Sequence, residues 1–173
     1  MVPHEEIIEV VDIHGSVIST AARSDVHRNP ALIHQVVHVL VFDRQGNLLL
    51  QKRSMDKDVA PGKWDTSVGG HVAPGEDIHA AAQRELREEL GIEIKDIVFL
   101  HRYLFTNSCE SELVSTFTGI SEGEIVFNKK EIDGVKYWSP KDITDQLGRG
   151  VFSNHFEREF IEYLKHRDNR KIP

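Results

Sequence analysis

The stretch GGHVAPGEDIHAAAQRELREELGI, residues 69–92, constrains the fold of this chain more than any other segment. A glycine-rich loop leads into residues 77–90, where apolar side chains recur at helical spacing, and Gly91 is placed to end the helix. Glu85, Glu88 and Glu89 lie on one face of that helix, because spacings of three and four bring side chains together. Like charges so placed each cost roughly 0.2–0.5 kcal/mol, so we expect a bound cation to offset their repulsion.

The flanking sequence predicts strands on both sides of this helix. Residues 5–19 predict two short strands, and residues 34–54 predict a hairpin around the turn DRQGN. Further strands are expected within residues 65–72, 92–106, 111–120 and 134–139, and helices over residues 139–147 and 156–167. Together these elements predict a single domain over residues 1–173. Its expected class is α/β (α+β), with a mixed β-sheet sandwiched between helices.

Composition excludes several classes of function. The net charge of −7 argues against binding a nucleic acid polymer, so a phosphate-bearing substrate needs locally placed Lys and Arg. No apolar run reaches the roughly 18 residues of a membrane span, and MVPHEEIIEV is too acidic for a signal peptide. The single cysteine, Cys109, excludes an intrachain disulfide and is interpreted as structural. We therefore expect a cytoplasmic protein without a membrane partner.

Residues 70–92 carry a motif. Gly70, then Glu76 after five residues, then RELREELGI at residues 84–92 after seven more, fit every fixed position of the Nudix box. An accidental match is expected in well below about one chain in 10⁶ at ordinary residue frequencies. The chain thus resembles a Nudix hydrolase. The resemblance implies the Nudix fold and hydrolysis of a diphosphate linked to another group.

The same residues suit Mg²⁺, which prefers oxygen ligands and is held by a few carboxylates together with substrate phosphates. The resemblance implies that Glu85, Glu88 and Glu89 are metal ligands, with Mn²⁺ as an alternative ion. Which of the three accepts the proton stays open, because the glutamate that matches Glu85 often serves as metal ligand or base in this family and the base varies among its members. A backbone carbonyl of the glycine-rich loop, from Gly69 or Gly70, is expected as a further ligand. Arg84 lies within reach of Glu88 and is expected to orient it.

A second resemblance lies outside the motif and covers roughly residues 10–160. His27, His34, His71, Glu110 and Glu112 resemble the five metal ligands of type 1 isopentenyl-diphosphate isomerase, a relative built on the Nudix fold. Alternation places the two glutamates on one strand face. Such ligands suit Zn²⁺, Mn²⁺ or Mg²⁺, so a second divalent ion is one reading of the cluster. A hydrogen-bonded polar cluster without metal is the other.

The isomerase resemblance also implies substrate contacts. Arg23, Arg53 and Lys57 are expected to face the diphosphate, and Tyr103 falls near the tyrosine of the isomerase active site. Glu131 falls where many Nudix hydrolases carry an additional glutamate, although its loop is also simply polar.

Two departures argue against isomerisation. The isomerase requires a cysteine acid/base where this chain has Gly69, and a cation-stabilising tryptophan where this chain has His155. An aromatic ring over a desolvated cation contributes about 2 kcal/mol or more, which a histidine replaces poorly. Glu112 or Tyr103 would then have to perform both proton transfers. The leading hypothesis is therefore Mg²⁺-dependent hydrolysis, followed by isomerisation and by a non-catalytic diphosphate-ligand sensor.

The sequence leaves the substrate and the assembly open. Nucleoside diphosphates and triphosphates, nucleotide sugars, dinucleotides and isoprenoid diphosphates all fit a small-molecule diphosphate substrate. Because many relatives dimerise, a homodimer also stays open.

Overall fold

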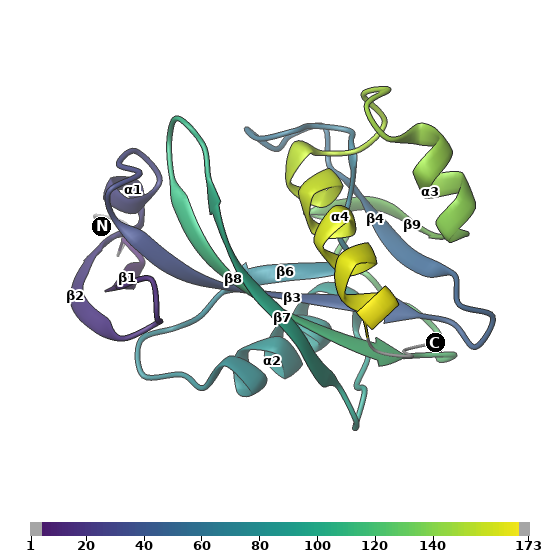
Figure 1. The fold of residues 1–173 in the computed structure, drawn as a ribbon, viewed down its shortest axis with the longest axis horizontal. Coiled ribbons are helices and arrows are strands. Elements are labelled where there is room, and N and C mark those ends of the chain that lie inside the picture. Colours follow the sequence, from purple (N-terminus) through teal and green to yellow (C-terminus); the bar gives the residue numbers. More distant parts are fainter. Residues whose placement is uncertain (1–4, 170–173) are drawn as a thin grey trace.

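The computed structural model describes residues 5–169, which form a nine-stranded sheet with helices packed on it (Figure 1). The strands are β1 (Ile7–Val11), β2 (Val17–Ala22), β3 (Ile33–Phe42), β4 (Leu48–Arg53), β5 (Trp64–Asp65), β6 (Val68–His71), β7 (Val98–Thr106), β8 (Ser111–Ile120) and β9 (Ile132–Trp138). The helices are α1 (Arg23–Val26), α2 (Ile78–Leu90), α3 (Pro140–Gln146) and α4 (Asn154–Asn169). The predicted domain limits, residues 1 and 173, lie outside the described residues.

Strand β3 is the centre of the sheet. It pairs in parallel with β8 along its whole length, from Ile33 opposite Ser111 to Phe42 opposite Ile120. Its other neighbours, β1, β4 and β6, are antiparallel. Strands β7 and β9 extend the sheet by pairing with β8 and β4. The sheet is therefore mixed, as the sequence predicts.

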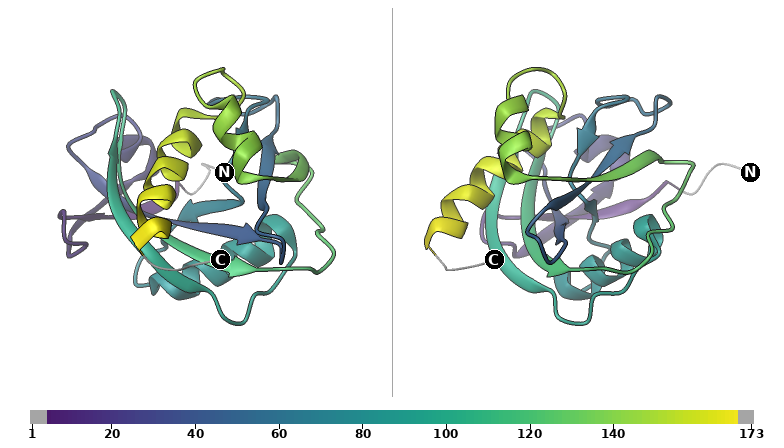
Figure 2. Two further views of the ribbon diagram at one scale, coloured as in Figure 1. Left: turned by 45° about the vertical axis from the view of Figure 1, so that its right-hand side comes forward. Right: turned by 90° about the vertical axis from the view of Figure 1, so that its right-hand side faces the viewer.

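Both faces of β3 are buried, which explains why its sequence is almost continuously apolar. Val37, Val39 and Val41 belong to the core cluster that contains the apolar face of α2. Leu40 and Phe42, at the alternate positions, belong to a second cluster with α3 and α4. Figure 2 shows α2 on one side of the sheet and α3 with α4 on the other. The predicted arrangement of a sheet between helices is confirmed.

Helix α2 begins and ends where the sequence predicts. The Asp77 carboxylate caps it by accepting hydrogen bonds from the backbone N–H groups of His79 at 2.9 Å and Ala80 at 3.2 Å. Gly91 follows its last residue with φ of 63°, the left-handed conformation that glycine adopts without strain. These two caps fix the ends of the helix that carries the three glutamates.

The structure differs from the sequence-based expectation in two places. Residues 92–97 form no strand, because Ile92, Ile94 and Ile97 enter the core from a loop and β7 starts only at Val98. Helix α1 was not expected, since four residues are too few to establish a helical period. Among residues 5–169, no helix combines the length and the apolar character that crossing a membrane requires.

The left-handed cap at Gly91 generates a stability prediction. In Gly91→Ala the new Cβ would lie 2.8 Å from the carbonyl oxygen of Val126, in a conformation that itself disfavours alanine. We expect the free energy of unfolding, measured by urea denaturation, to fall by about 1–3 kcal/mol. Gly134→Ala is the matched control, because a Cβ there meets no atom within 4 Å. Equal losses in the two variants would contradict the capping role.

Candidate active site

A cavity of about 470 Å³ opens beside α2 and strands β3, β4, β5 and β6. The residues that line it are Glu6, Arg23, His27, Val36, His38, Gln51, Arg53, Lys57, Asp65, Thr66, Gly69, Gly70, His71, Ala73, Arg84, Glu85, Glu88, Glu89, Glu112, Glu131 and His155. Apart from the two glycines, Val36 and Ala73 are its apolar members, so the cavity is lined by charged and hydrogen-bonding groups.

Arg84 organises the acidic side of this cavity. Its Nε and Nη2 atoms donate to the two carboxylate oxygens of Glu76, both at 2.9 Å. Its Nη1 atom donates to Glu85 at 2.5 Å and to Glu88 at 3.2 Å, and Nη2 also donates to the carbonyl of His71 at 3.0 Å. The hydrogen bonds from Arg84 lower the pKa of Glu76. The expected contact between Arg84 and Glu88 is present, within a larger network that ties the glycine-rich loop to α2.

Glu85 lies directly against Gly70. A Cβ at residue 70 would come within 2.2 Å of the Glu85 carboxyl carbon, so a side chain there would displace the carboxylate. Burial raises the pKa of Glu85, although the hydrogen bond from Arg84 opposes the shift. The glycine of the motif is therefore needed for the close approach of this acid.

Glu89 is held from another direction. Its Oε2 atom accepts a hydrogen bond from Gln51 Nε2 at 2.8 Å and a longer one from the Gly69 N–H at 3.4 Å. Burial raises the pKa of Glu89 to about 8, despite the hydrogen bond from Gln51. A carboxylate that is costly to ionise in the free protein gains most from a cation beside it.

The donor set of the motif fits Mg²⁺, which prefers oxygen ligands. However, the three carboxylates do not surround one common position in this structure. Arg84 holds Glu85 and Glu88, whereas Gln51 holds Glu89. Over residues 5–169, sets of three ligand atoms within 4.8 Å of one another occur around His34 and not in the motif. Joint binding of one ion therefore requires these carboxylates to move from the positions in which Arg84 and Gln51 hold them.

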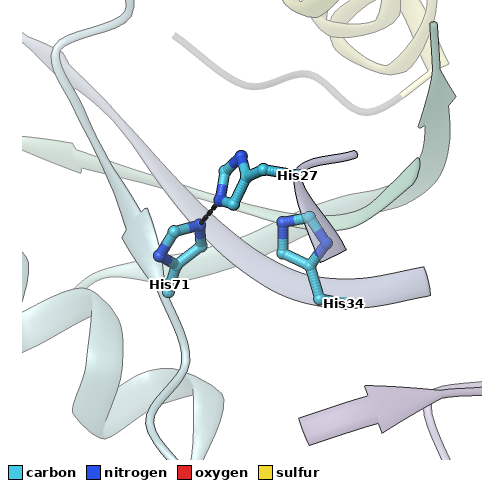
Figure 3. A group of neighbouring side chains, drawn as sticks. All are labelled: His27, His34 and His71. Carbon is cyan, nitrogen blue, oxygen red and sulfur yellow. Dashed lines mark hydrogen bonds between the residues drawn. The ribbon is translucent and has the colours of Figure 1, made fainter. Parts of the chain in front are cut away.

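Three histidines from separate elements converge beside the cavity (Figure 3). His27 follows α1, His34 lies near the start of β3 and His71 ends β6. Their ring centroids are 5.1–5.2 Å apart, and Nε2 of His27 and Nε2 of His71 share a hydrogen bond of 3.1 Å. The structure thus brings together residues that are up to 44 positions apart.

The two predicted glutamates complete this cluster. Glu110 Oε2 lies 2.5 Å from His27 Nδ1, and Glu112, the β8 partner of His34, places Oε1 3.8 Å from His34 Nε2. Within the described chain, neither ring nitrogen of His34 has a hydrogen-bond partner. Burial lowers the pKa of His34 and that of His71, the latter to about 4. These two imidazoles are therefore neutral near pH 7, the form that binds metal ions.

The three basic residues expected to face a diphosphate all line the cavity. Each already has an acidic partner. The pairs are Arg23 with Glu6 at 3.1 Å, Arg53 with Asp65 at 3.3 Å and Lys57 with Glu131 at 2.9 Å. A phosphate group entering the cavity would therefore compete with carboxylates for these cations.

Tyr103 does not lie at the cavity, where the isomerase resemblance predicts it to contact the substrate. Its hydroxyl donates to Glu159 Oε2 at 2.7 Å, and Tyr103 is not among the residues that line the cavity. Glu159 is fully buried and also contacts His38 at 2.6 Å, His101 at 3.1 Å and Thr116 at 2.8 Å. Burial acts to raise the pKa of Glu159, but its hydrogen bonds outweigh that effect and lower it.

The sequence analysis missed this Glu159 network and the pair formed by His155 and Glu112. His155 Nε2 lies 2.6 Å from Glu112 Oε2. Burial opposes ionisation of both groups, yet their interaction raises the pKa of His155 and lowers that of Glu112 to about 2. The available signal was His38, a polar residue inside the apolar run of β3, whereas Glu159 stands among charged residues of α4 and gave none.

Comparison with known proteins identifies a matching family model and several sequence relatives. A family model described as NUDIX domain matches residues 32–160. A Streptomyces coelicolor protein named isopentenyl-diphosphate Delta-isomerase is 32% identical, over 87% of this chain and 79% of its own length. A Yersinia pestis protein named an uncharacterized Nudix hydrolase is 33% identical, over 80% of this chain and 76% of its own length.

Solved structures share the fold. The crystal structure of DR0079 from Deinococcus radiodurans matches with a TM-score of 0.78 and 25% identity, covering 90% of this chain and 98% of that one. A MutT protein from Methanosarcina mazei matches with a TM-score of 0.69 and 22% identity, covering 82% and 98%. These likenesses confirm the predicted fold class.

The raised pKa of Glu89 predicts a pH-dependent stability. Because its folded-state pKa of about 8 exceeds the ordinary 4.5, the folded protein keeps a proton that the unfolded chain loses. This stabilisation is complete below about pH 4.5 and is lost as the pH rises through about 8. In EDTA, we expect the wild-type Tm to fall more between about pH 5 and pH 9 than the Tm of Glu89→Gln, which cannot ionise.

Glu93→Gln is the control for this measurement, because the Glu93 side chain is 75% exposed just beyond the same helix. It should follow the wild-type pH curve. Parallel curves for wild type and Glu89→Gln would contradict the assignment of the raised pKa.

Proposed function

We propose that this chain, which belongs to the Nudix domain family, is a Mg²⁺-dependent hydrolase of a small-molecule diphosphate derivative. Proteins of this family commonly use divalent metal ions and act on small diphosphate compounds. The observation that carries the proposal is the meeting, in one cavity, of the motif glutamates and the basic residues Arg23, Arg53 and Lys57.

In this proposal Glu85, Glu88 and Glu89 hold the ion, with the Gly69 carbonyl as a further ligand. When bound, Mg²⁺ or Mn²⁺ would neutralise phosphate charge and lower the pKa of an attacking water. Arg84 would keep its two bonds to Glu76 and so continue to hold the glycine-rich loop on α2.

The basic side chains would bind the phosphate oxygens. Arg53 and Lys57 would exchange Asp65 and Glu131 for phosphate, since charge-assisted hydrogen bonds to phosphate are strong. Arg23 would exchange Glu6 in the same way. Release of Glu131 from Lys57 would also free that carboxylate inside the cavity.

Isomerisation of isopentenyl diphosphate is the second candidate, favoured by the names of several relatives and by the clustered His27, His34 and His71. Two observations weigh against it. Gly69 provides no acid/base group, and Tyr103 is engaged by the buried Glu159 instead of facing the cavity. Incubation with isopentenyl diphosphate and divalent ions, followed by NMR, separates the candidates. The allylic isomer would indicate isomerisation, and binding without any product would indicate a ligand sensor.

We also propose that the cluster of His27, His34, His71, Glu110 and Glu112 holds a second divalent ion. The unpartnered ring nitrogens of buried His34 support this reading, because buried polar atoms are normally hydrogen-bonded or bound to a ligand. Imidazole and carboxylate ligands suit Zn²⁺ or Mn²⁺.

The hydrolase proposal predicts that Glu88→Gln and Glu89→Gln each lower Mg²⁺-dependent phosphate release by about 100-fold or more, because each removes a metal ligand. Phosphate release from a panel of nucleoside diphosphates, nucleotide sugars and isoprenoid diphosphates, with and without Mg²⁺, is the measurement. Circular dichroism should show an unchanged fold.

Glu93→Gln serves again as the control, since it removes an equal charge from the surface near α2. It should retain wild-type turnover. Unchanged turnover in either motif variant would refute the proposed role of these glutamates.

The second ion generates its own prediction. By calorimetric titration, wild-type protein should bind Zn²⁺ at the cluster, and His34→Ala should weaken that binding by about 10–100-fold through loss of a ligand. His14→Ala, which removes an exposed histidine from the β1–β2 turn, is the control. Identical Zn²⁺ binding by all three proteins would contradict a metal site there.

A further inference from the structure

Gln51 of β4 is a polar residue of the cavity that the motif does not contain. It is only 8% exposed, and it lines the cavity beside the motif glutamates. Its backbone lies between two other strands, opposite Asp65 of β5 and Val135 of β9. Because both neighbours fix the backbone, the amide reaches a limited set of partners, and a buried amide requires partners.

The Gln51 amide donates two hydrogen bonds through the same nitrogen. Nε2 donates to Glu89 Oε2 at 2.8 Å and to the carbonyl of Ser67 at 3.3 Å. A carbonyl and an ionised carboxylate only accept hydrogen bonds, so turning the amide over would place its oxygen against two other oxygens. The NH₂ group is therefore fixed toward Glu89.

Ser67 holds the other end of this arrangement in the sheet. Its hydroxyl accepts a hydrogen bond from the backbone N–H of Val41 at 2.9 Å and donates to the carbonyl of Leu49, so it is bonded to both β3 and β4. Ser67 is also fully buried. The carbonyl that accepts from Gln51 is thus anchored, and the orientation of the amide follows from the sheet.

The side-chain hydrogen bonds of Glu89 use one of its two carboxylate oxygens. Oε2 accepts from Gln51 and from a backbone N–H of β6, whereas Oε1 has no hydrogen-bond partner in the described part of the chain. Glu85 and Glu88 differ, because both are bonded to the positive charge of Arg84, which an ion would have to displace. Glu89 can therefore turn Oε1 toward an ion and keep its hydrogen bond to Gln51.

We propose that Gln51 is a positioning residue for Glu89: its amide holds one carboxylate oxygen so that the other faces the divalent ion. This inference rests on the proposed function, which makes Glu89 a ligand of that ion. Hydrogen-bond partners orient metal ligands, and their loss typically weakens metal binding by about 10–100-fold. Gln51 acts through Glu89 and does not itself contact the ion.

A double-mutant cycle tests this role. Mn²⁺ affinity is measured from the EPR signal of the free aqua ion in wild type, Gln51→Met, Glu89→Gln and the double variant. We expect Gln51→Met to weaken binding about 10-fold, but to cause no further loss once Glu89→Gln is present. Equal losses in the two backgrounds, as a merely structural role would give, overturn the inference.

Gln83→Met is the matched control. Gln83 is also partly buried and donates Nε2 to a backbone carbonyl, that of Ile94 at 2.7 Å, but it lies on α2 outside the cavity. Its variant should bind Mn²⁺ within about twofold of wild type, because distant sites act independently. A loss equal to that of Gln51→Met would indicate general destabilisation and overturn the inference.

A second replacement protects the test against a folding defect. Gln51→Leu also lacks the donor and should reproduce the loss seen in Gln51→Met, with an unchanged circular dichroism spectrum. Full Mn²⁺ binding by a folded Gln51→Leu protein would overturn the inference.

The histidine cluster has ligands that also suit Mn²⁺, so the cycle is repeated in the His34→Ala background. The same losses are expected there, because the weakened cluster then competes less for the ion. An effect of Gln51→Met that disappears in His34→Ala would belong to the cluster and overturn the inference.

Failure of this inference differs from failure of the proposed function. Full Mn²⁺ binding by Glu89→Gln refutes the ligand role of that carboxylate and overturns both proposals. Weakened binding by Glu89→Gln together with full binding by Gln51→Met overturns the positioning role alone and leaves the hydrolase proposal standing.

Discussion

Arg84 is the side chain on which the acidic half of the cavity depends. It bonds Glu76, Glu85 and Glu88 and also the carbonyl of His71, so one guanidinium joins the glycine-rich loop to the face of α2. Without that charge the neighbouring carboxylates would repel one another, and the loop would lose its attachment. Arg84 therefore does in the free protein what a divalent cation would do in the loaded protein. In the loaded protein the divalent ion would bind Glu85, Glu88 and Glu89, and the Arg84 guanidinium would remain bonded to Glu76.

The remainder of the site follows from the central position of β3. Its parallel partner β8 sets Glu112 beside His34, and its antiparallel partner β6 sets Gly69 beside His38. One strand thus contributes His34 to the histidine cluster and His38 to the cavity wall, while α2 supplies the motif glutamates. The glycines of β6 make this crowding feasible, because Gly70 admits the Glu85 carboxylate and Gly69 admits the His38 ring. The Glu85 carboxylate and the His38 ring therefore fit into the cavity wall because glycines stand at the two neighbouring positions of β6.

The sequence predicted those parts of the molecule that depend on local order. The ends of α2 were predictable because Asp77 and Gly91 are local capping signals, and the motif glutamates because helical periodicity places them on one face. His27, His34, His71, Glu110 and Glu112 were found only through resemblance to a family, since they lie on four different segments. Glu159 could not be found from sequence, because its contacts join α4 to residues as many as 121 positions away. Helix α1 and the loop at residues 92–97 were missed because short segments have no period to detect.

The central claim is that the carboxylates on α2 exist to bind a divalent ion. Crystals soaked in Mn²⁺ and measured at the manganese absorption edge test this most directly, because anomalous scattering locates the ion itself. The account predicts a strong anomalous peak within about 2.0–2.4 Å of oxygens from Glu85, Glu88 and Glu89, with Arg84 displaced from the first two. No peak at α2, with Arg84 still bonded to both carboxylates at saturating Mn²⁺, would contradict it.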